Sequence, residues 1–133
     1  MTLWQPGMIL TEERLNDGID PTVVTTGLVP AANFTVADFW AARSGRVVSV
    51  MCILEYTGTG IALASGNLPD TTMCTLPSDW RPPVVVNAEW GDGTESGECT
   101  IGTTGVITLR SSNLSIPDVD PNRNMRVSVT WID

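Results

Sequence analysis

The sequence contains no histidine and no lysine, and these two absences restrict the chemistry that the chain can perform. Histidine is the commonest general base and metal ligand, and lysine is required for Schiff-base and Ser-Lys mechanisms. The remaining route to catalysis uses two carboxyl groups that face each other across a cleft, as in glycosidases. Glu89, Asp92, Glu95 and Glu98 are close in sequence, but acidic residues in glycine-rich loops are usually just solvated. We therefore expect no enzymatic activity, no catalytic residue and no cofactor.

Basic residues are scarce as well. Seven arginines stand against 15 acidic residues, which gives a net charge of −8, and Arg43 with Arg46 is the densest basic pair. Binding a nucleic-acid backbone requires several clustered cations, and an acidic surface disfavours contact with anionic membranes. The first residues lack the pattern of a signal peptide, and no apolar run approaches the roughly 20 residues that span a bilayer. We expect neither nucleic acid nor a membrane as a partner, and synthesis in a cytoplasm.

The three cysteines, Cys52, Cys74 and Cys99, are far apart and form no C-x-x-C motif. Without histidine they do not make a zinc site, and no metal is expected. Cys52 lies in an apolar run and is predicted to be a buried thiol. Whether Cys74 and Cys99 form a disulfide is left open: they could pair, although a cytoplasmic origin favours reduced thiols.

Residues 118–124 reproduce the D-x-[DN]-x-[DN] opening of a calcium-binding loop. The match then stops, because Arg123 replaces the required glycine and Val129 stands where a bidentate glutamate is needed. A polar loop between two strands explains the segment better. The sequence does not decide whether a weak calcium site exists near Asp118 and Asp120.

Residues 1–20 are predicted to form an attachment segment, an extended arm with a short helix. Thr11 can cap a helical turn that carries Glu12, and Asn16-Asp17-Gly18 supplies a stop. Large apolar groups at a chain terminus usually need a surface to cover them. We expect them to attach the chain to a partner; the alternative is that Trp4 and Ile9 pack on their own domain. The attachment residues are Trp4, Ile9, Leu10 and Leu15.

Residues 21–133 are predicted to form one β-domain, since the chain of 133 residues is of common single-domain size. Alternation is clearest near the end, where Met125, Val127, Val129 and Trp131 share one face. Short β-rich stretches joined by turns, without a substantial amphipathic helix, predict an all-β, antiparallel β-sandwich or jelly roll. The expected strands are 22–26, 34–40, 46–56, 61–64, 71–76, 84–90, 98–101, 106–110 and 125–132.

Two parts of the sequence resemble bacteriophage virion proteins. Trp4-Gln5-Pro6-Gly7-Met8-Ile9-Leu10-Thr11-Glu12-Glu13-Arg14-Leu15-Asn16 is similar to the W-x-x-G-x-x-[IL]-T-x-x-x-L-N opening of small minor tail and tail-fibre proteins of actinobacterial phages. The remainder resembles the C-terminal head domains of phage tail fibres. The stretches that carry this second resemblance are 45–50, Thr75-Leu76-Pro77-Ser78-Asp79-Trp80-Arg81-Pro82, 99–107 and 127–132.

The resemblance implies a virion location and a trimeric domain at a fibre tip. The motif residues also have structural roles: prolines fix the backbone around a crossing, Arg81 can bond loop carbonyls and Gly105 supplies a hairpin turn. A homotrimer would also explain an apolar excess. If Phe34, Phe39, Trp40 and Trp131 fill one core, Trp80 beside a proline-rich turn is left for an interface between subunits.

The expected function is that of a minor tail or fibre-tip subunit that contributes to host-surface attachment, with other phage structural proteins as partners. The turn Gly91-Asp92-Gly93 predicts a hairpin, and an aromatic plane beside carboxylates suits sugar hydroxyls. Trp90, Asp92 and Glu95 are therefore candidate contacts to a host glycan. The alternative is a capsid decoration protein or head fibre; a carbohydrate-cleaving tailspike module is a third hypothesis.

Overall fold

The computed structural model describes residues 11–12, 20–64, 67–113 and 118–133. The predicted N-terminal helix beyond Glu12 and the proposed attachment residues Trp4, Ile9, Leu10 and Leu15 lie outside them. Within the described residues the chain is all-β, as predicted. The strands are β1 Thr22–Val24, β2 Val29–Pro30, β3 Phe34–Ser44, β4 Val47–Tyr56, β5 Ile61–Ala62, β6 Thr71–Thr75, β7 Val86–Gly91, β8 Ser96–Ile101, β9 Val106–Leu109, β10 Asp118–Val119 and β11 Arg123–Ile132, with a 3-10 turn at Ser78–Trp80.

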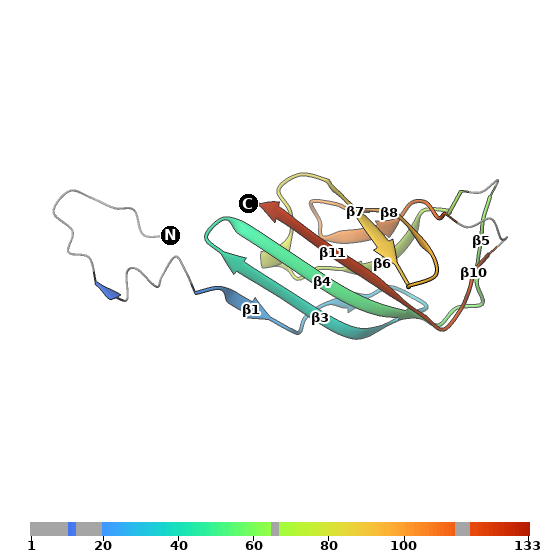
Figure 1. The fold of residues 1–133 in the computed structure, drawn as a ribbon, viewed down its shortest axis with the longest axis horizontal. Coiled ribbons are helices and arrows are strands. Elements are labelled where there is room, and N and C mark those ends of the chain that lie inside the picture. Colours follow the sequence, from blue (N-terminus) through green and yellow to red (C-terminus); the bar gives the residue numbers. More distant parts are fainter. Residues whose placement is uncertain (1–10, 13–19, 65–66, 114–117) are drawn as a thin grey trace.

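Nine of these strands form one antiparallel sheet in the order β1-β3-β4-β11-β7-β8-β9-β6-β2. The sheet curls over its own core, and β5 with β10 forms a small separate sheet (Figure 1). The prediction of a sandwich or jelly roll was wrong in this respect. β11 pairs with β4 on one side and with β7 on the other, so hydrogen bonds join the two halves into one continuous sheet. The twist of the strands allows this single sheet to fold over itself.

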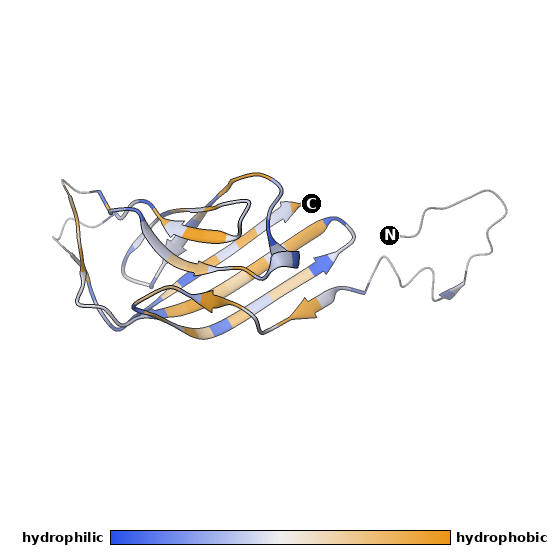
Figure 2. Ribbon diagram, turned by 180° about the vertical axis from the view of Figure 1, so that it is seen from behind, coloured by the Kyte–Doolittle hydropathy of each residue, from blue (hydrophilic) through white to orange (hydrophobic). Residues whose placement is uncertain are grey.

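Alternation along the long strands decides which side chains enter the core. In β4, alternate residues from Val48 to Tyr56 are buried, and those between them face outward. Their partners in β11 are the predicted residues: Met125, Val127 and Trp131 are buried, and Val129 is half-buried. Figure 2 shows hydrophobic and hydrophilic residues interleaved along this part of the sheet.

Trp40 was predicted to lie in the core and Trp80 at an interface between subunits, whereas the structure shows the reverse order of burial. Trp80 is only 8% exposed, and the guanidinium of Arg43 lies 5.7 Å from the centre of its ring. Arg43 is held there because it also donates to the carbonyl of Asp79 (2.6 Å) and pairs with Asp133 (2.9 Å). Trp40, expected in the core, instead faces outward opposite Met51 and is 38% exposed. Trp80 therefore belongs to the core, and Trp40 is the more exposed of the two side chains.

The motif residues have the structural roles expected of them. Arg81 Nε donates to the carbonyl of Leu76 at 3.2 Å, and the turn between β8 and β9 has Gly105 at φ +83°. A Cβ atom at Gly105 would lie 2.9 Å from Arg81 Cγ, so both the turn and the arginine require glycine there. This contact holds the Pro-rich connection against the β8–β9 hairpin.

The two ends of the domain differ. β1 enters and β11 finishes at one end, whereas the β5–β10 sheet lies at the other (Figure 1). Arg46, in the β3–β4 turn, donates to Asp133 after β11, which ties the first end together. In the part of the chain that the structure describes, no helix has the length and apolar character needed to span a membrane.

Candidate functional site

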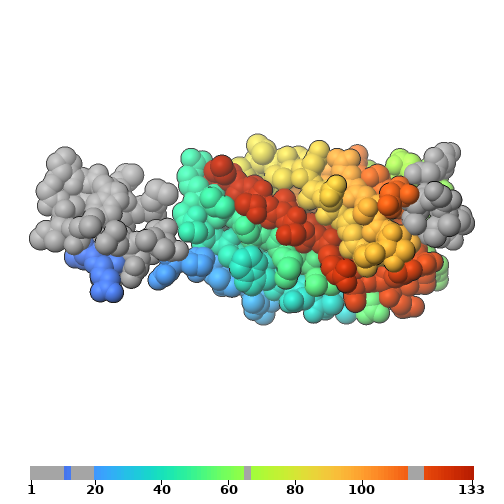
Figure 3. Space-filling view, viewed as in Figure 1, coloured from blue at the N-terminus to red at the C-terminus, as the bar shows by residue number. Residues whose placement is uncertain are grey.

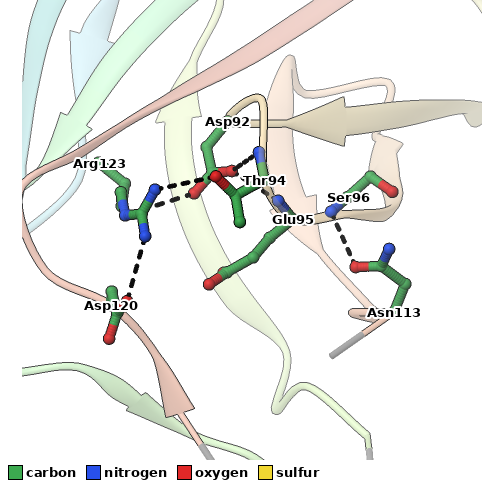
Figure 4. A network of polar contacts seen from close by, with 7 residues as sticks. All are labelled: Asp92, Thr94, Glu95, Ser96, Asn113, Asp120 and Arg123. Atoms are coloured by element: carbon green, nitrogen blue, oxygen red, sulfur yellow. Dashed lines mark hydrogen bonds and ion pairs between the residues drawn. The ribbon is translucent and has the colours of Figure 1, made fainter. Parts of the chain in front are cut away.

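The turn between β7 and β8 is organised by the side chain of Asp92. Its Oδ1 accepts hydrogen bonds from the backbone N–H groups of Thr94 (2.8 Å) and Glu95 (2.7 Å), and its own N–H donates to the Glu95 carbonyl (3.0 Å). Gly93 has φ +97°, which glycine adopts without strain. The predicted reversal at Gly91-Asp92-Gly93 is confirmed, and the carboxylate at its centre is a structural acceptor (Figure 4).

Arg123, the first residue of β11, connects this turn to the preceding loop. Its guanidinium donates to Thr94 Oγ1 (3.1 Å) and to Asp120 Oδ2 (3.3 Å), and its Nε lies 4.0 Å from Asp92 Oδ2 (Figure 4). Arg123, which stands where a calcium loop requires glycine, thus pairs with Asp120 of the same segment. Among the described residues, no group of three or more Cys, Asp or Glu side chains is placed to hold a metal ion. The side chain of Asp118 lies outside them.

Glu95 is the most unusual residue of the turn. It is 2% exposed, and neither carboxyl oxygen has a hydrogen-bond partner. Burial raises the pKa of Glu95 above its ordinary value, and the nearby charges of Asp92 and Asp120 raise it further, while Arg123 acts in the opposite direction. The folded protein therefore favours the neutral form of Glu95 more than an exposed glutamate would.

The aromatic residue of the predicted glycan contact is buried. Trp90 is 1% exposed, and its indole N–H donates to the carbonyl of Ser111 at 2.9 Å. The Asp92 side chain has no exposed surface either. A stacking platform requires an open ring face, so Trp90 does not supply one, and the three predicted contact residues lie beneath the surface rather than on it. Alternation in β7 carried this signal, because Trp90 shares the inward face with Ala88 and Val86.

The opposite face of this part of the sheet carries polar residues, among them Asn87, Glu89 and Arg126, which the sequence analysis did not propose as glycan contacts. Glu89 on β7 lies directly opposite Glu98 on β8, and both are exposed. A shallow hollow of about 460 Å³ lies over Asn87, Glu89 and Glu98, and a second of about 410 Å³ lies over Glu89, Arg126 and Ser128. Carboxylates, an amide, a hydroxyl and a guanidinium thus line two adjacent depressions, a set of groups that can hydrogen-bond a hydroxyl-rich ligand.

The three cysteines, Cys52, Cys74 and Cys99, lie in the core rather than in a site. They come from β4, β6 and β8, are fully buried and are unpaired. Burial raises the pKa of Cys99 to about 12, and the pKa of Cys74 is raised by hydrogen bonding to Cys52 and by burial. These are inert thiols, because the reactive form is the thiolate.

Comparisons with known proteins add a structural relative. No protein-family model and no curated protein sequence matches the chain. Among solved structures, the chain is similar to the receptor binding protein (gp15) of Listeria phage PSA. The match covers 92% of this chain and 73% of that protein, with a TM-score of 0.53 and 15% sequence identity. At this identity the likeness shows that the two share a fold.

Proposed function

We propose that this chain is a structural subunit of a bacteriophage particle, a minor tail or fibre-tip protein that contributes to attachment to the host surface without enzymatic activity. The observation that supports this most directly is the fold, which it shares over 92% of its length with a phage receptor binding protein. The sequence resemblances to minor tail and tail-fibre proteins point the same way.

The two ends of the domain suggest how such a subunit is oriented. Residues 1–20, with Trp4, Ile9, Leu10 and Leu15, precede β1 and are the proposed attachment to other virion proteins. The end that carries the β5–β10 sheet lies away from β1 and is free to face the host (Figure 1). In this orientation, the surfaces that attach to the host lie away from residues 1–20, which attach to the virion.

A host-surface glycan is the proposed ligand, bound in the two hollows beside Glu89. Polar groups that line shallow hollows on neighbouring strands suit a sugar chain, whose hydroxyls both donate and accept hydrogen bonds. Asp92 shapes the hairpin, and Trp90 and Glu95 pack beneath it. Their role is to support the surface from below.

The deciding experiment locates the chain and tests its role together. Antibodies against the purified protein, coupled to gold, should label the tail tip in electron micrographs of virions. The purified protein should compete with phage for adsorption to host cells, and the Glu89→Arg variant should compete less well. Label on the shell would indicate a capsid decoration protein instead. Label on the tail without any competition would reduce the proposal to a structural tail subunit.

A further inference from the structure

One half of the curled sheet has an apolar outer surface. We define the apolar face as the outward apolar residues of β1, β3, β4 and β11 toward the β3–β4 turn: Val23, Trp40, Val47, Met51 and Ile132. Val23 is 48% exposed, Trp40 38%, Val47 47% and Ile132 67%, and Met51 is half-buried. Register joins them, because Trp40 is opposite Met51 and Val47 is opposite Ile132. Figure 3 shows β3, β4 and β11 (cyan, green and red) side by side across one visible surface.

The apolar face contains no charge. Between the Trp40–Met51 pair and the Val47–Ile132 pair, the outward residues of β3, β4 and β11 are all uncharged. Two of the polar ones, Ser49 and Thr130, satisfy each other through a 2.8 Å hydrogen bond between their hydroxyls. Removing water from this face therefore costs little, which is the property of a surface that is covered in the working protein.

Residues 1–20 join the domain beside this face. β1 begins at Thr22, which pairs with Arg43, and the next residue of β3, Ser44, pairs with Val47. The chain therefore enters the sheet at the same end as Val47 and Ile132. The face extends roughly 15 Å along and across its strands, at about 3.3 Å per residue and 4.8 Å per strand. Since ten extended residues reach about 33 Å, residues 3–10 can contact all of the face.

The composition of this segment matches the apolar face. Residues 1–11 carry no charged side chain, and the first charges of the sequence are at Glu12 and Glu13. The same stretch contains five large apolar residues: Leu3, Trp4, Met8, Ile9 and Leu10. A segment joined to the domain is also present at a high effective concentration, so it competes well with any separate molecule for the face.

We propose that in the free protein residues 3–10 cover the apolar face of their own domain, and that they leave it when the subunit attaches to the virion. The release rests on the proposed function, in which Trp4, Ile9 and Leu10 bind other virion proteins. The same side chains cannot pack on the domain and on a virion partner at once. The contact is therefore autoinhibitory: it shields the attachment residues until the subunit meets its place in the particle.

An engineered disulfide tests the contact in the full chain. Gln5→Cys with Ser49→Cys places one thiol in the segment and one in the middle of the face, and it replaces no apolar side chain. The native cysteines are buried, so the engineered thiols are the ones that react under mild oxidation. We expect a link within one chain, formed at least about tenfold faster than in the control pair Gln5→Cys with Thr100→Cys on the polar half of the sheet.

Variants of the apolar side chains separate a contact from mere tethering. Trp4→Ser with Ile9→Ser, added to the Gln5→Cys and Ser49→Cys pair, should slow the link, and so should Trp40→Ser in the face. The change at Trp4 and Ile9 lies outside the sheet, so it decides the matter even if Trp40→Ser misfolds. Unchanged rates overturn the contact. A link between two chains, seen as a doubled mass on a non-reducing gel, would show that a second copy covers the face and would overturn it too.

The linked protein tests the release. In an extract that supplies particles lacking this subunit, the parent and the reduced cysteine pair should enter the virion, and the linked form should not. Equal entry of the linked and reduced forms overturns the release. Exclusion of the parent as well would contradict the proposed virion role, whereas the contact is decided by the cross-linking rates alone.

Discussion

Glu95 combines three properties that rarely occur together in one side chain. It is almost fully buried, it lacks hydrogen-bond partners, and it faces two further carboxyl groups, those of Asp92 and Asp120. The one facing cation, Arg123, is already engaged with Thr94 and Asp120. Ionisation of Glu95 therefore adds a buried negative charge that the turn is not built to neutralise.

This arrangement predicts a pH dependence of stability. Because the folded pKa of Glu95 is raised above the unfolded value, the group's contribution is fully present below the unfolded pKa and is lost as pH rises through the folded pKa. Glu95→Gln cannot ionise and should therefore raise the free energy of unfolding at neutral pH, because the folded protein no longer has to bury the charge or take up a proton to avoid it. Urea unfolding at several pH values measures the difference.

The stability difference between the two proteins should shrink as pH falls below the ordinary pKa of a glutamate, where Glu95 is protonated in both the folded and the unfolded chain. Glu89→Gln is the matched control, because Glu89 is exposed on the opposite face of the same hairpin, and its profile should follow that of the parent. A constant offset between Glu95→Gln and the parent across all pH values would show that ionisation of Glu95 is not the cause.

At the scale of elements, the β7–β8 pair depends on one glycine. Gly97 lies opposite Trp90, and a Cβ atom there would stand 1.9 Å from the Ser111 carbonyl oxygen and 2.6 Å from Trp90 Nε1. The absence of a side chain at Gly97 is what admits the indole and its hydrogen bond to Ser111.

Gly97→Ala should therefore destabilise the protein by about 3 kcal/mol, at the upper end of overpacking effects, because backbone as well as side chain must move. Thermal unfolding together with tryptophan fluorescence would measure the loss and report on the Trp90 environment. Gly102→Ala in the next turn is the comparison, since its Cβ would meet nothing closer than 3.7 Å. Equal unfolding temperatures for the two variants would contradict the packing role of Gly97.

Strands were predictable where alternation is long and pairing is local. The stretches 46–56 and 125–132 correspond closely to β4 and β11, and the turn at 91–93 is where it was expected. Alternation with a period of two residues predicts which side chains share a face of a strand, but it does not predict which strands lie beside one another. It therefore could not show that β11 pairs on both sides and makes one curled sheet. The candidate site was not predicted for a related reason: an aromatic residue beside carboxylates suggested Trp90, which lies on the inward face of β7, whereas the exposed polar residue Glu89 stands one position away.

At the scale of the whole molecule, the division between arm and domain makes a prediction about assembly. Removing residues 1–18 should leave the β-domain folded, because every strand of the sheet begins at or after Thr22. The truncated chain should not enter virions, since burial of side chains such as Trp4 and Leu10 would supply roughly 1.5–3 kcal/mol each.

Thermal unfolding of the truncated protein, compared with its recovery in purified particles, separates the two roles. An unfolded truncation would assign residues 1–18 to the core. A folded truncation that still assembles would place the virion contact on the domain itself.

The position of β11 also governs when the fold can form. This strand lies between β4 and β7 in the sheet, yet it follows every other described strand in the chain. Until it has been synthesised, the two halves of the sheet have no common strand, and each presents an open edge to other nascent chains. Its ladder with β4 closes a loop of some seventy residues, a long-range step of the kind that slows folding of β-proteins. The apolar core can therefore close only after β11 has been synthesised and has paired with β4 and β7.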